Sequence, residues 1–345
     1  MGKYIGILTG GGDCPGLNAV IRAIVRRAMQ EDIPVHGIQS GWLGLVNGDI
    51  KPLSRYSVAG IQYKGGSILG TSRFSPLEDK SALKKMRDNW KKFGLDSLIV
   101  VGGNGTLSAA TQMWRDEGYP IVGIPKTIDN DIVGTDYTIG FDTAVSIASE
   151  AIDRLHTTAE SQHRVMVVEV MGRHTGWIAT HAGLAGGADI ILVPEKPFRI
   201  SEICEMLQQR QAVGRNFSIV VVAEDARPHP DEDFLSEKQR ERIYRENRLG
   251  GIGALVAIQI EKRIKLSSRV TVLGYIQRGG SPTAFDRVLA TRLGVHAVEM
   301  VLRKEFGRMA ASCGLQITSV LLESVANRLK PVDEDIFRVA EIFFG

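Results

Sequence analysis

The sequence is poor in cysteine and in long apolar runs, and its charges nearly balance. The cysteines Cys14, Cys204 and Cys313 are far apart, so they indicate neither a disulfide framework nor a zinc site. No apolar run approaches the ~20 residues of a membrane span, and the first residues lack a signal-peptide pattern. The net charge is +3, with Lys and Arg spread along the chain, unlike the basic face of a nucleic-acid binder. We therefore expect a cytoplasmic protein without a membrane or nucleic-acid partner.

The 345 residues, 43% of them hydrophobic and 23% charged, are sufficient for two globular domains. Short apolar runs such as 4–9, 97–101 and 164–170 alternate with amphipathic, helix-like segments. This alternation predicts an α/β fold with largely parallel sheets. The run 269–273 is expected to be the last strand. Residues 225–247 are rich in charge, and we expect an exposed excursion that leads into a solvated helix.

One stretch joins a predicted strand directly to a group of polar side chains. The apolar run 121–124 is followed closely by Lys126, Asp129 and Asp131. Polar residues directly after an apolar strand are typical of a site at the carboxyl edge of an open α/β sheet. Two carboxylates at i and i+2, with a lysine nearby, suit a proton acceptor beside an anionic substrate and a metal. An acidic surface turn is the alternative.

Glycine-rich loops are placed where they can bind phosphate. GGGDCPGLN (10–18) follows an apolar run and precedes a helix-like segment, and GGNGTLSAA (102–110) is placed in the same way. Another glycine-rich loop, 64–74, has Arg73 near its end. Backbone N–H groups, helix N-termini and an arginine suit a polyphosphate better than an apolar ligand. The first loop has neither the GxGxxG nor the GxxxxGK[ST] pattern, and a tight turn without a ligand is the alternative.

These motifs, in their order and spacing, resemble the phosphofructokinase family over essentially the whole chain. The matching segments are LTGGGDCPGLN (8–18), GTSRF (70–74), GGNGTL (102–107), PKTIDNDI (125–132), GTDYTIGFDTA (134–144), VEVMGRHTGW (168–177) and VLGYIQRGGSP (272–282). The resemblance implies two doubly wound, Rossmann-like domains. The larger, donor-binding domain would comprise residues 1–139 and 277–328. The smaller domain, which would bind fructose 6-phosphate, would comprise residues 140–276 and 329–345.

The resemblance also implies a reaction, the transfer of a phosphoryl group to the 1-hydroxyl of fructose 6-phosphate. Asp129 is then the base that accepts the hydroxyl proton, and Thr127 and Ile128 line the same loop. Lys126 and Arg173 join Asp129 and Thr127 as expected catalytic residues. The phosphoryl donor is expected to contact Gly11, Gly12, Arg73, Phe74, Gly102, Gly103, Asn104, Gly105 and Thr106.

The sugar phosphate is expected to bind mainly to residues further along the chain. The resemblance assigns to it Met171, Gly172, Arg173, Glu224, Tyr275, Ile276, Gln277 and Arg278, together with the loop residues Thr127, Ile128 and Asp129. Arg164 and Arg269 would reach the 6-phosphate from a neighbouring subunit, because arginine forks suit phosphate. Surface arginines at strand starts are the alternative. Such sharing implies at least a homodimer, and the family makes a homotetramer the expected assembly.

Three residues depart from the pattern of the family's ATP-using members. Asn104 is placed where an acidic residue usually holds Mg²⁺. The metal would therefore be bound mainly by Asp129, Asp131, water and oxygen atoms of the donor. Tyr275 is placed where a histidine commonly contacts the sugar phosphate. Lys126 is placed where many ATP-using members have glycine and pyrophosphate-using members have lysine.

The choice of phosphoryl donor depends on Gly105 and Lys126. Pyrophosphate-using members resemble one another in having an aspartate at the Gly105 position, where it blocks the α-phosphate of a nucleotide. Gly105 leaves room for the nucleotide, and Lys126 stabilises a leaving phosphate without excluding one, so we expect ATP with Mg²⁺. A pyrophosphate-dependent enzyme is the first alternative, and a non-catalytic sugar-phosphate sensor is the second.

A regulatory site is suggested by Arg22, Arg26, Arg55 and Arg154. These arginines match positions that bind a nucleoside diphosphate between subunits in regulated bacterial members of the family. Arg22 and Arg26 are four residues apart, so a solvated helix face explains them equally well.

Overall fold

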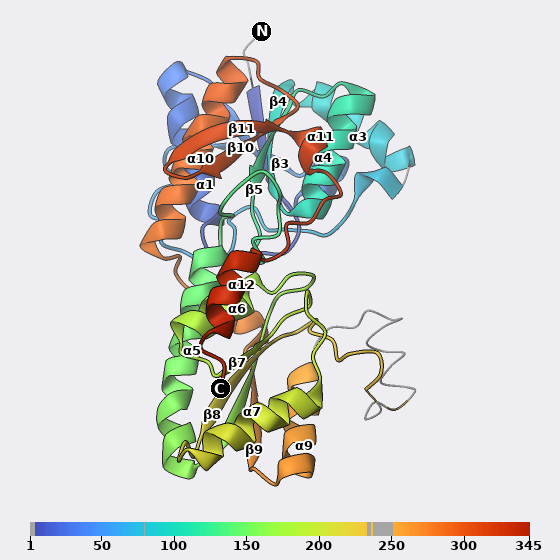
Figure 1. The fold of residues 1–345 in the computed structure, drawn as a ribbon. Coiled ribbons are helices and arrows are strands. Elements are labelled where there is room, and N and C mark those ends of the chain that lie inside the picture. Colours follow the sequence, from blue (N-terminus) through green and yellow to red (C-terminus); the bar gives the residue numbers. More distant parts are fainter. Residues whose placement is uncertain (1–3, 79, 233–235, 237–250) are drawn as a thin grey trace. The chain divides into compact units, whose positions relative to one another are not determined.

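The computed structural model describes residues 4–78, 80–232, 236 and 251–345. The chain divides into two compact units, each made of separate segments of the sequence (Figure 1). Unit 1 comprises Met1–Thr143 and Arg278–Leu329, and unit 2 comprises Ala144–Gln277 and Lys330–Gly345. The predicted fold class is confirmed, because strands alternate with helices and most strand pairs are parallel.

Unit 1 begins as a regular alternation of strands and helices. Its elements are β1 (Tyr4–Thr9), α1 (Leu17–Ala28), η1 (Met29–Glu31), β2 (Val35–Ile38), α2 (Trp42–Asn47), β3 (Ile50–Leu53), η2 (Pro76–Glu78), α3 (Lys80–Lys92), β4 (Leu95–Gly102), α4 (Asn104–Glu117), β5 (Ile121–Pro125), the start of α5 (Phe141–Gln162), α10 (Ala284–Leu302), β10 (Arg308–Cys313), β11 (Gln316–Leu321) and α11 (Leu322–Val325).

The sheet of unit 1 has the strand order β11-β10-β5-β4-β1-β2-β3. The strands from β10 to β2 are parallel, and the antiparallel strands β3 and β11 form the two edges. The central strands are almost continuously buried, as in β4, where only Asp96 is exposed. Both faces of a parallel sheet are covered, so its strands are apolar along their whole length.

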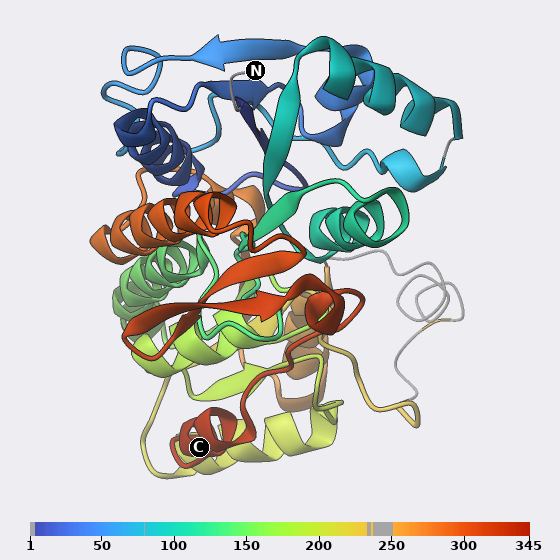
Figure 2. The ribbon, with the colours of Figure 1, turned by 90° about the horizontal axis from the view of Figure 1, so that it is seen from above.

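Helices cover both faces of this sheet. One core cluster joins β1, β2 and β4 to α2, α3, α4 and α11, and includes the buried residues Trp42, Met86, Leu107 and Leu322. On the other face α1 and α10 lie side by side, as Figure 2 shows in dark blue and orange. Gly294 of α10 has no room for a Cβ against Val20 and Ala23 of α1, so a glycine permits this close approach. The arrangement is a doubly wound sheet.

Unit 2 contains a smaller sheet in which every pair of neighbouring strands is parallel. Its order is β7-β8-β6-β9, and β7 and β9 are its edges. Its elements are the rest of α5, β6 (Val165–Val170), α6 (Trp177–Ala185), β7 (Ile190–Leu192), α7 (Ile200–Ala212), β8 (Ser218–Ala223), α9 (Ile252–Ile264), β9 (Ser268–Val272), η4 (Gly274–Arg278) and α12 (Glu334–Glu341). Helix α12 packs on α6, and α7 packs on α9.

Two expectations about the fold were wrong. The run 269–273 is not the last strand, because the hairpin β10–β11 follows it. Its strand RMAASC contains small side chains rather than the branched ones that mark a buried strand. Residues 225–232 are not an exposed excursion, because Asp225, Ala226 and Glu232 are buried. The solvated helix expected after them falls on residues 233–247, which lie outside the described residues except for Ser236.

Among the described residues, no helix is both long enough and apolar enough to span a membrane.

Candidate active site

The carboxyl ends of three neighbouring strands of unit 1 place the predicted donor and catalytic loops together. β1, β4 and β5 are adjacent in the sheet, and the segments 10–13, 103–105 and 126–131 start where these strands end. Gly10 N donates to Val101 O at 2.9 Å, and Lys126 N donates to Gly102 O at 2.9 Å. Ligands of open α/β sheets bind at this edge, so the predicted loops share the position that such a site requires.

Lys126 is a buried cation beneath the first glycine loop. Its side chain is 2% exposed, and its Nζ donates to Gly12 O at 2.5 Å. Burial lowers the pKa of the Lys126 ammonium from its usual value, since removal from water disfavours the charged form. Gly11 has a φ of +81° and passes close to the ammonium. The lysine is therefore fixed against the loop that is expected to hold the donor phosphates.

The amino end of α4 presents backbone groups at the same edge. The N-cap is Gly103, which has no side chain to cap the helix, and the first N–H groups of a helix lack intrahelical partners. Thr106 packs beneath Gly10 and Gly102, where no Cβ would fit. At Gly105, by contrast, an added Cβ would meet no described atom within 4 Å outside its own helix backbone and chain neighbours. This helix end is therefore of the kind that can bind phosphate through its first amides.

The predicted catalytic segment, residues 126–131, alternates over 127–130 between partly exposed and buried side chains. Thr127 and Asp129 are partly exposed, whereas Ile128 and Asn130 are buried. Thr127 Oγ1 accepts a hydrogen bond from Asp129 N at 3.1 Å, which is a local turn of the kind threonine favours. Thr127 and Asp129 are therefore both accessible to solvent in this segment. Ile128 is 1% exposed, so its side chain belongs to the core and only its backbone is available to a substrate.

Asn104 and Asp131 form a pair of oxygen-bearing side chains beside this segment. Asn104 Nδ2 donates to Asp131 Oδ2 at 2.9 Å. The buried Oδ1 of Asn104 has no hydrogen-bond partner in the described part of the chain. Among the described residues, no group of three or more His, Cys, Asp or Glu side chains gathers as a metal site. Mg²⁺ commonly keeps several waters and binds through few carboxylates plus phosphate oxygens, so this pair fits Mg²⁺ held jointly with a phosphate ligand.

Arg278 lies against the first glycine loop. Its NH1 donates to Asp13 O at 3.2 Å, and it is so close to Gly12 that a Cβ there would clash with it. Its buried Nε has no hydrogen-bond partner among the described residues. The arginine expected to hold the sugar phosphate is thus packed beside the donor loop. Arg73 is exposed and Phe74 half-buried in the neighbouring glycine-rich loop.

The carboxyl ends of β6, β8 and β9 in unit 2 gather most of the predicted sugar-phosphate residues. Glu224 N donates to Val170 O at 2.8 Å, and Gly172 N donates to the Glu224 carboxylate at 3.4 Å. Gly172 has a φ of +140° and no room for a Cβ. Arg173 follows it and is exposed, whereas Met171 is buried.

The segment after β9 has two exposed residues and one that is fully buried. Tyr275 and Ile276 are 79% and 66% exposed. Gln277 is buried, and its Nε2 donates to Gly274 O at 3.2 Å. The Gln277 side chain therefore supports the turn, and its predicted contact with the sugar stays a prediction.

Arg164 and Arg269 lie at the opposite edge of the same sheet. Arg164 precedes β6, and Arg269 is the second residue of β9, paired with Met166. Glu224 and Gly172 follow the carboxyl ends of β8 and β6. Unit 2 thus separates these two arginines from the rest of the predicted sugar site by the length of a strand. The structure therefore does not bring Arg164 and Arg269 together with the other predicted sugar-phosphate residues of unit 2.

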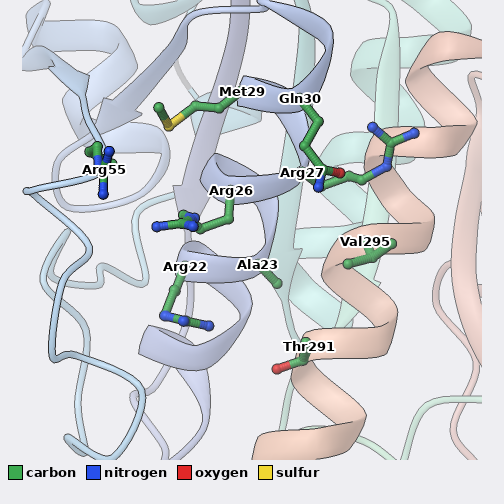
Figure 3. Close-up of a pocket in the computed structure, with 9 residues that line it drawn as sticks. All are labelled: Arg22, Ala23, Arg26, Arg27, Met29, Gln30, Arg55, Thr291 and Val295. Atoms are coloured by element: carbon green, nitrogen blue, oxygen red, sulfur yellow. The ribbon is translucent and has the colours of Figure 1, made fainter.

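Three of the four arginines of the suggested regulatory site line one pocket of about 600 Å³. Arg22 and Arg26 come from α1 and Arg55 from the chain after β3, as Figure 3 shows. Arg27 also lines the pocket, but it extends toward α10 and pairs with Glu31 at 2.8 Å and Glu299 at 3.8 Å. The fourth predicted residue, Arg154, lies in unit 2.

Several acidic residues that accept backbone hydrogen bonds were not predicted; Asp286 and Glu169 are buried, whereas Glu195 is exposed. Asp286 accepts hydrogen bonds from Gly140 and Thr143. Glu169 accepts from Gly251 and Gly253 at the start of α9, and Glu195 accepts from Gly176 and Val332. The sequence TAFD (283–286) has the spacing of a capping box, which was the only available signal for any of them.

Glycine loops, a buried lysine and a carboxylate at the carboxyl ends of parallel strands are typical of α/β proteins that bind phosphate-bearing ligands. A family model described as Phosphofructokinase matches residues 4–301. The chain therefore belongs to the phosphofructokinase family.

Relatives with two kinds of name are similar to this chain. The chain is 51% identical to a pyrophosphate–fructose 6-phosphate 1-phosphotransferase of Streptomyces coelicolor, over 99% of each chain. It is 49% identical to ATP-dependent 6-phosphofructokinase 3 of the same organism, over 98% of each. These two names differ in the phosphoryl donor that they state, pyrophosphate or ATP.

Solved structures match the fold. A phosphofructokinase from Saccharomyces cerevisiae superposes with a TM-score of 0.80 at 31% identity, over 93% of this chain and 45% of the yeast chain. A pyrophosphate-dependent phosphofructokinase from Nitrosospira multiformis gives a TM-score of 0.85 at 22% identity, over 99% of this chain and 92% of the other. The second likeness concerns the fold alone.

Proposed function

We propose that this phosphofructokinase transfers the terminal phosphoryl group of ATP to the 1-hydroxyl of fructose 6-phosphate, giving fructose 1,6-bisphosphate as a step of glycolysis. The observation that carries the proposal is the shared edge of β1, β4 and β5, where the donor loops meet the segment of Asp129. Phosphoryl transfer needs a positioned acceptor, cationic groups and donors around the transferred oxygens. Lys126 and the amino end of α4 would supply a cation and hydrogen-bond donors at this edge, and the predicted sugar loops of unit 2 would position the acceptor.

Asp129 is the proposed general base. Asp129 is partly exposed, as Thr127 is, and its backbone N–H donates to the Thr127 hydroxyl. It takes the proton of the sugar 1-hydroxyl as the oxygen bonds to phosphorus and ADP leaves. Arg173 and Lys126 stabilise the charge that develops on the transferred group and on the leaving phosphate.

The donor phosphates are proposed to bind Gly11, Gly12, Arg73, Phe74 and the amino end of α4 from Gly102 to Thr106. Asn104 and Asp131 would hold Mg²⁺ through oxygen atoms, together with donor phosphates and water. When bound, the metal neutralises phosphate charge.

The sugar phosphate is proposed to bind the loops at the carboxyl ends of the unit 2 strands. The residues concerned are Met171, Gly172, Arg173, Glu224, Tyr275 and Ile276, with Arg278 of unit 1. Arg164 and Arg269 would complete the site of a neighbouring subunit, so we expect an oligomer, with the homotetramer that the family suggests. Units 1 and 2 are thus proposed as the donor-binding and sugar-binding domains of a cytoplasmic enzyme.

Gly105 supports the choice of ATP. The space beside it is open, since an added Cβ would lie more than 4 Å from every described atom outside its own helix backbone and chain neighbours. A nucleotide α-phosphate has room there, whereas an aspartate side chain would compete for the same space. The second candidate donor is pyrophosphate. Lys126 supports it, because a buried ammonium below the glycine loop suits a leaving phosphate.

A donor comparison tests the proposal. Purified enzyme with Mg²⁺ and fructose 6-phosphate is supplied with ATP, ADP or pyrophosphate in turn, and formation of fructose 1,6-bisphosphate is measured. We expect the highest kcat/KM with ATP. A preference for pyrophosphate would reverse the donor assignment, and binding of fructose 6-phosphate without turnover would indicate the sensor alternative.

The variant Gly105→Asp sharpens the comparison. The new carboxylate would overlap and repel the α-phosphate, so kcat/KM for ATP should fall roughly 10²-fold or more. Pyrophosphate lacks that group, and its relative use should rise. Gly105→Ala is the matched control, because it adds only a methyl group to the same open space. If Gly105→Asp kept the ATP preference of the unmutated enzyme, the steric argument would fail.

A further inference from the structure

We propose that Asp286 is a positioning residue for phosphoryl transfer, which holds the segment of Asp129 in its reactive geometry without contacting a substrate. The inference rests on the proposed function and adds a residue from α10 to it. Asp286 is fully buried in the first turn of that helix. In the described part of the chain no ion pair joins it to a cation, so its carboxylate depends on hydrogen bonds.

The carboxylate accepts all of these hydrogen bonds from residues at the start of α5. Asp286 Oδ1 accepts from Gly140 N at 2.9 Å. Oδ2 accepts from Thr143 N at 2.9 Å and from Thr143 Oγ1 at 2.5 Å. The first N–H groups of a helix have no intrahelical partner, and a negative charge there is favourable. Asp286 therefore caps α5 from another helix.

A second set of contacts connects the two helix starts in the opposite direction. Thr283, the N-cap of α10, donates through Oγ1 to Asp142 in the first turn of α5 at 2.6 Å. Thr283 N donates to Thr143 Oγ1 at 3.1 Å. We call Asp142, Thr143, Thr283 and Asp286 the helix-start latch. Because its contacts run both ways, neither helix start can shift without the other.

The latch is attached directly to the catalytic segment. Two residues before Gly140, Thr138 donates through Oγ1 to Thr127 O at 2.6 Å and through its backbone N to Asn130 Oδ1 at 3.0 Å. Ile139 N donates to Pro125 O at 3.2 Å. Residues 138–140 therefore hold both sides of Asp129, and Asp286 holds residue 140.

The first glycine loop packs on the same point. Cys14 Sγ donates to Ile139 O at 3.3 Å. Gly16 has no room for a Cβ because Ile139 fills the space, with Asp286 just beyond. Asp286 thus lies where the donor loop, the catalytic segment and the helix after Arg278 meet. A small displacement of a base relative to its acceptor costs a large factor in rate, which makes this point sensitive.

The primary test is Asp286→Asn, which keeps the shape but replaces one acceptor oxygen with an NH₂ group facing an N–H donor. We expect kcat to fall about 10- to 100-fold while KM for fructose 6-phosphate stays within about threefold. Backbone amide exchange in a peptide covering residues 126–143 should become faster. That readout needs no turnover, so it tests the positioning role even if the proposed reaction is wrong.

Two further variants separate positioning from simple stability. Thr143→Ser keeps the hydroxyl that Asp286 accepts from, whereas Thr143→Val removes it with little change of shape, so only the valine variant should lose kcat. This pair also serves if Asp286→Asn does not fold. Asn89→Ala is the control, because Asn89 Nδ2 holds the last carbonyls of α2 at Leu45 and Val46, away from the latch. It should lower the melting temperature and leave kcat unchanged.

Three results would overturn the proposal. The first is a folded Asp286→Asn enzyme with kcat within about twofold of the unmutated one. The second is equal kcat for the serine and valine variants at position 143. The third is an Asn89→Ala enzyme whose kcat falls by the same factor as that of Asp286→Asn when both variants lose the same amount of stability. Absence of turnover in the unmutated enzyme with every donor would instead contradict the proposed function.

Discussion

The Lys126 ammonium donates a hydrogen bond of 2.5 Å to the carbonyl oxygen of Gly12, across more than a hundred residues of sequence. The ammonium therefore packs against the first glycine loop, although its residue follows β5 in the chain. We predict that Lys126→Met lowers kcat/KM with pyrophosphate by about 10²-fold, because a charge-assisted contact to a leaving phosphate is lost. With ATP the loss should be about tenfold or less. Initial rates with both donors check this, and equal losses would show that Lys126 does not discriminate between them.

Asp129 should be indispensable for turnover but not for sugar binding. Asp129→Ser removes the proton acceptor, and kcat should fall by about 10³-fold or more while KM for fructose 6-phosphate changes little. Steady-state kinetics at saturating donor give both constants. A variant that retained even a tenth of the original turnover would remove Asp129 from the role of base.

The placement of Arg164 at the amino end of β6 predicts shared sites between subunits. Asp129→Ser and Arg164→Ala proteins, each nearly inactive, should regain activity when mixed under conditions of subunit exchange. With random pairing, about a quarter of the sites would carry both original residues. Native mass spectrometry confirms the exchange. Mixed oligomers without regained activity would indicate self-contained protomers.

Asp286 should make the stability of the enzyme depend on pH in a defined window. Burial raises the pKa of Asp286 from its usual 3.8 to about 6, although its bonds to Thr143 and Gly140 lower it, and Asp142 adds to the increase. The buried thiol of Cys14 also faces it, with Lys126 and Arg278 near that thiol. Between about pH 4 and pH 6 the folded chain therefore binds more protons at this site than the unfolded chain.

The sign of the effect follows from this difference. The stabilisation from the bound proton is fully present below pH 4 and is lost as the pH rises through about 6. The free energy of unfolding of the unmutated chain, relative to Asp286→Asn, should fall by about 2–3 kcal/mol across that window. Urea unfolding of both proteins at intervals from pH 4 to pH 7 measures it. Parallel pH profiles would contradict the prediction.

The position of the donor and catalytic loops was predictable because local rules and topology agree there. An apolar run followed at once by Lys126 and Asp129 has one main arrangement in a parallel sheet, with the polar residues at its carboxyl edge. The same rule located Glu224 after β8. These predictions needed only the period of the apolar residues and the positions of the glycines.

Other features depend on partners that are distant in sequence. The spacing of Thr283 and Asp286 indicates a capping box, in which the acidic side chain returns to its own helix start. In the structure Asp286 instead accepts from Gly140 and Thr143, which are more than 140 residues earlier. Strand β10 escaped prediction because its small residues are buried by helix packing, and Asp225 and Glu232 are buried by contacts that no local pattern specifies.

Unit 1 is built from two segments that are far apart in the sequence, and this affects how the chain folds. Strand β5 ends at Pro125, but β10, which pairs with it at Val122 and Gly123, begins at Arg308. During synthesis the segment Ala144–Gln277 of unit 2 emerges between these two strands, so one side of β5 has no neighbour for that whole interval. An unpaired apolar strand edge is prone to association with other chains. We therefore expect refolding to be slow and sensitive to protein concentration, with closure of the β5–β10 pair among the last steps.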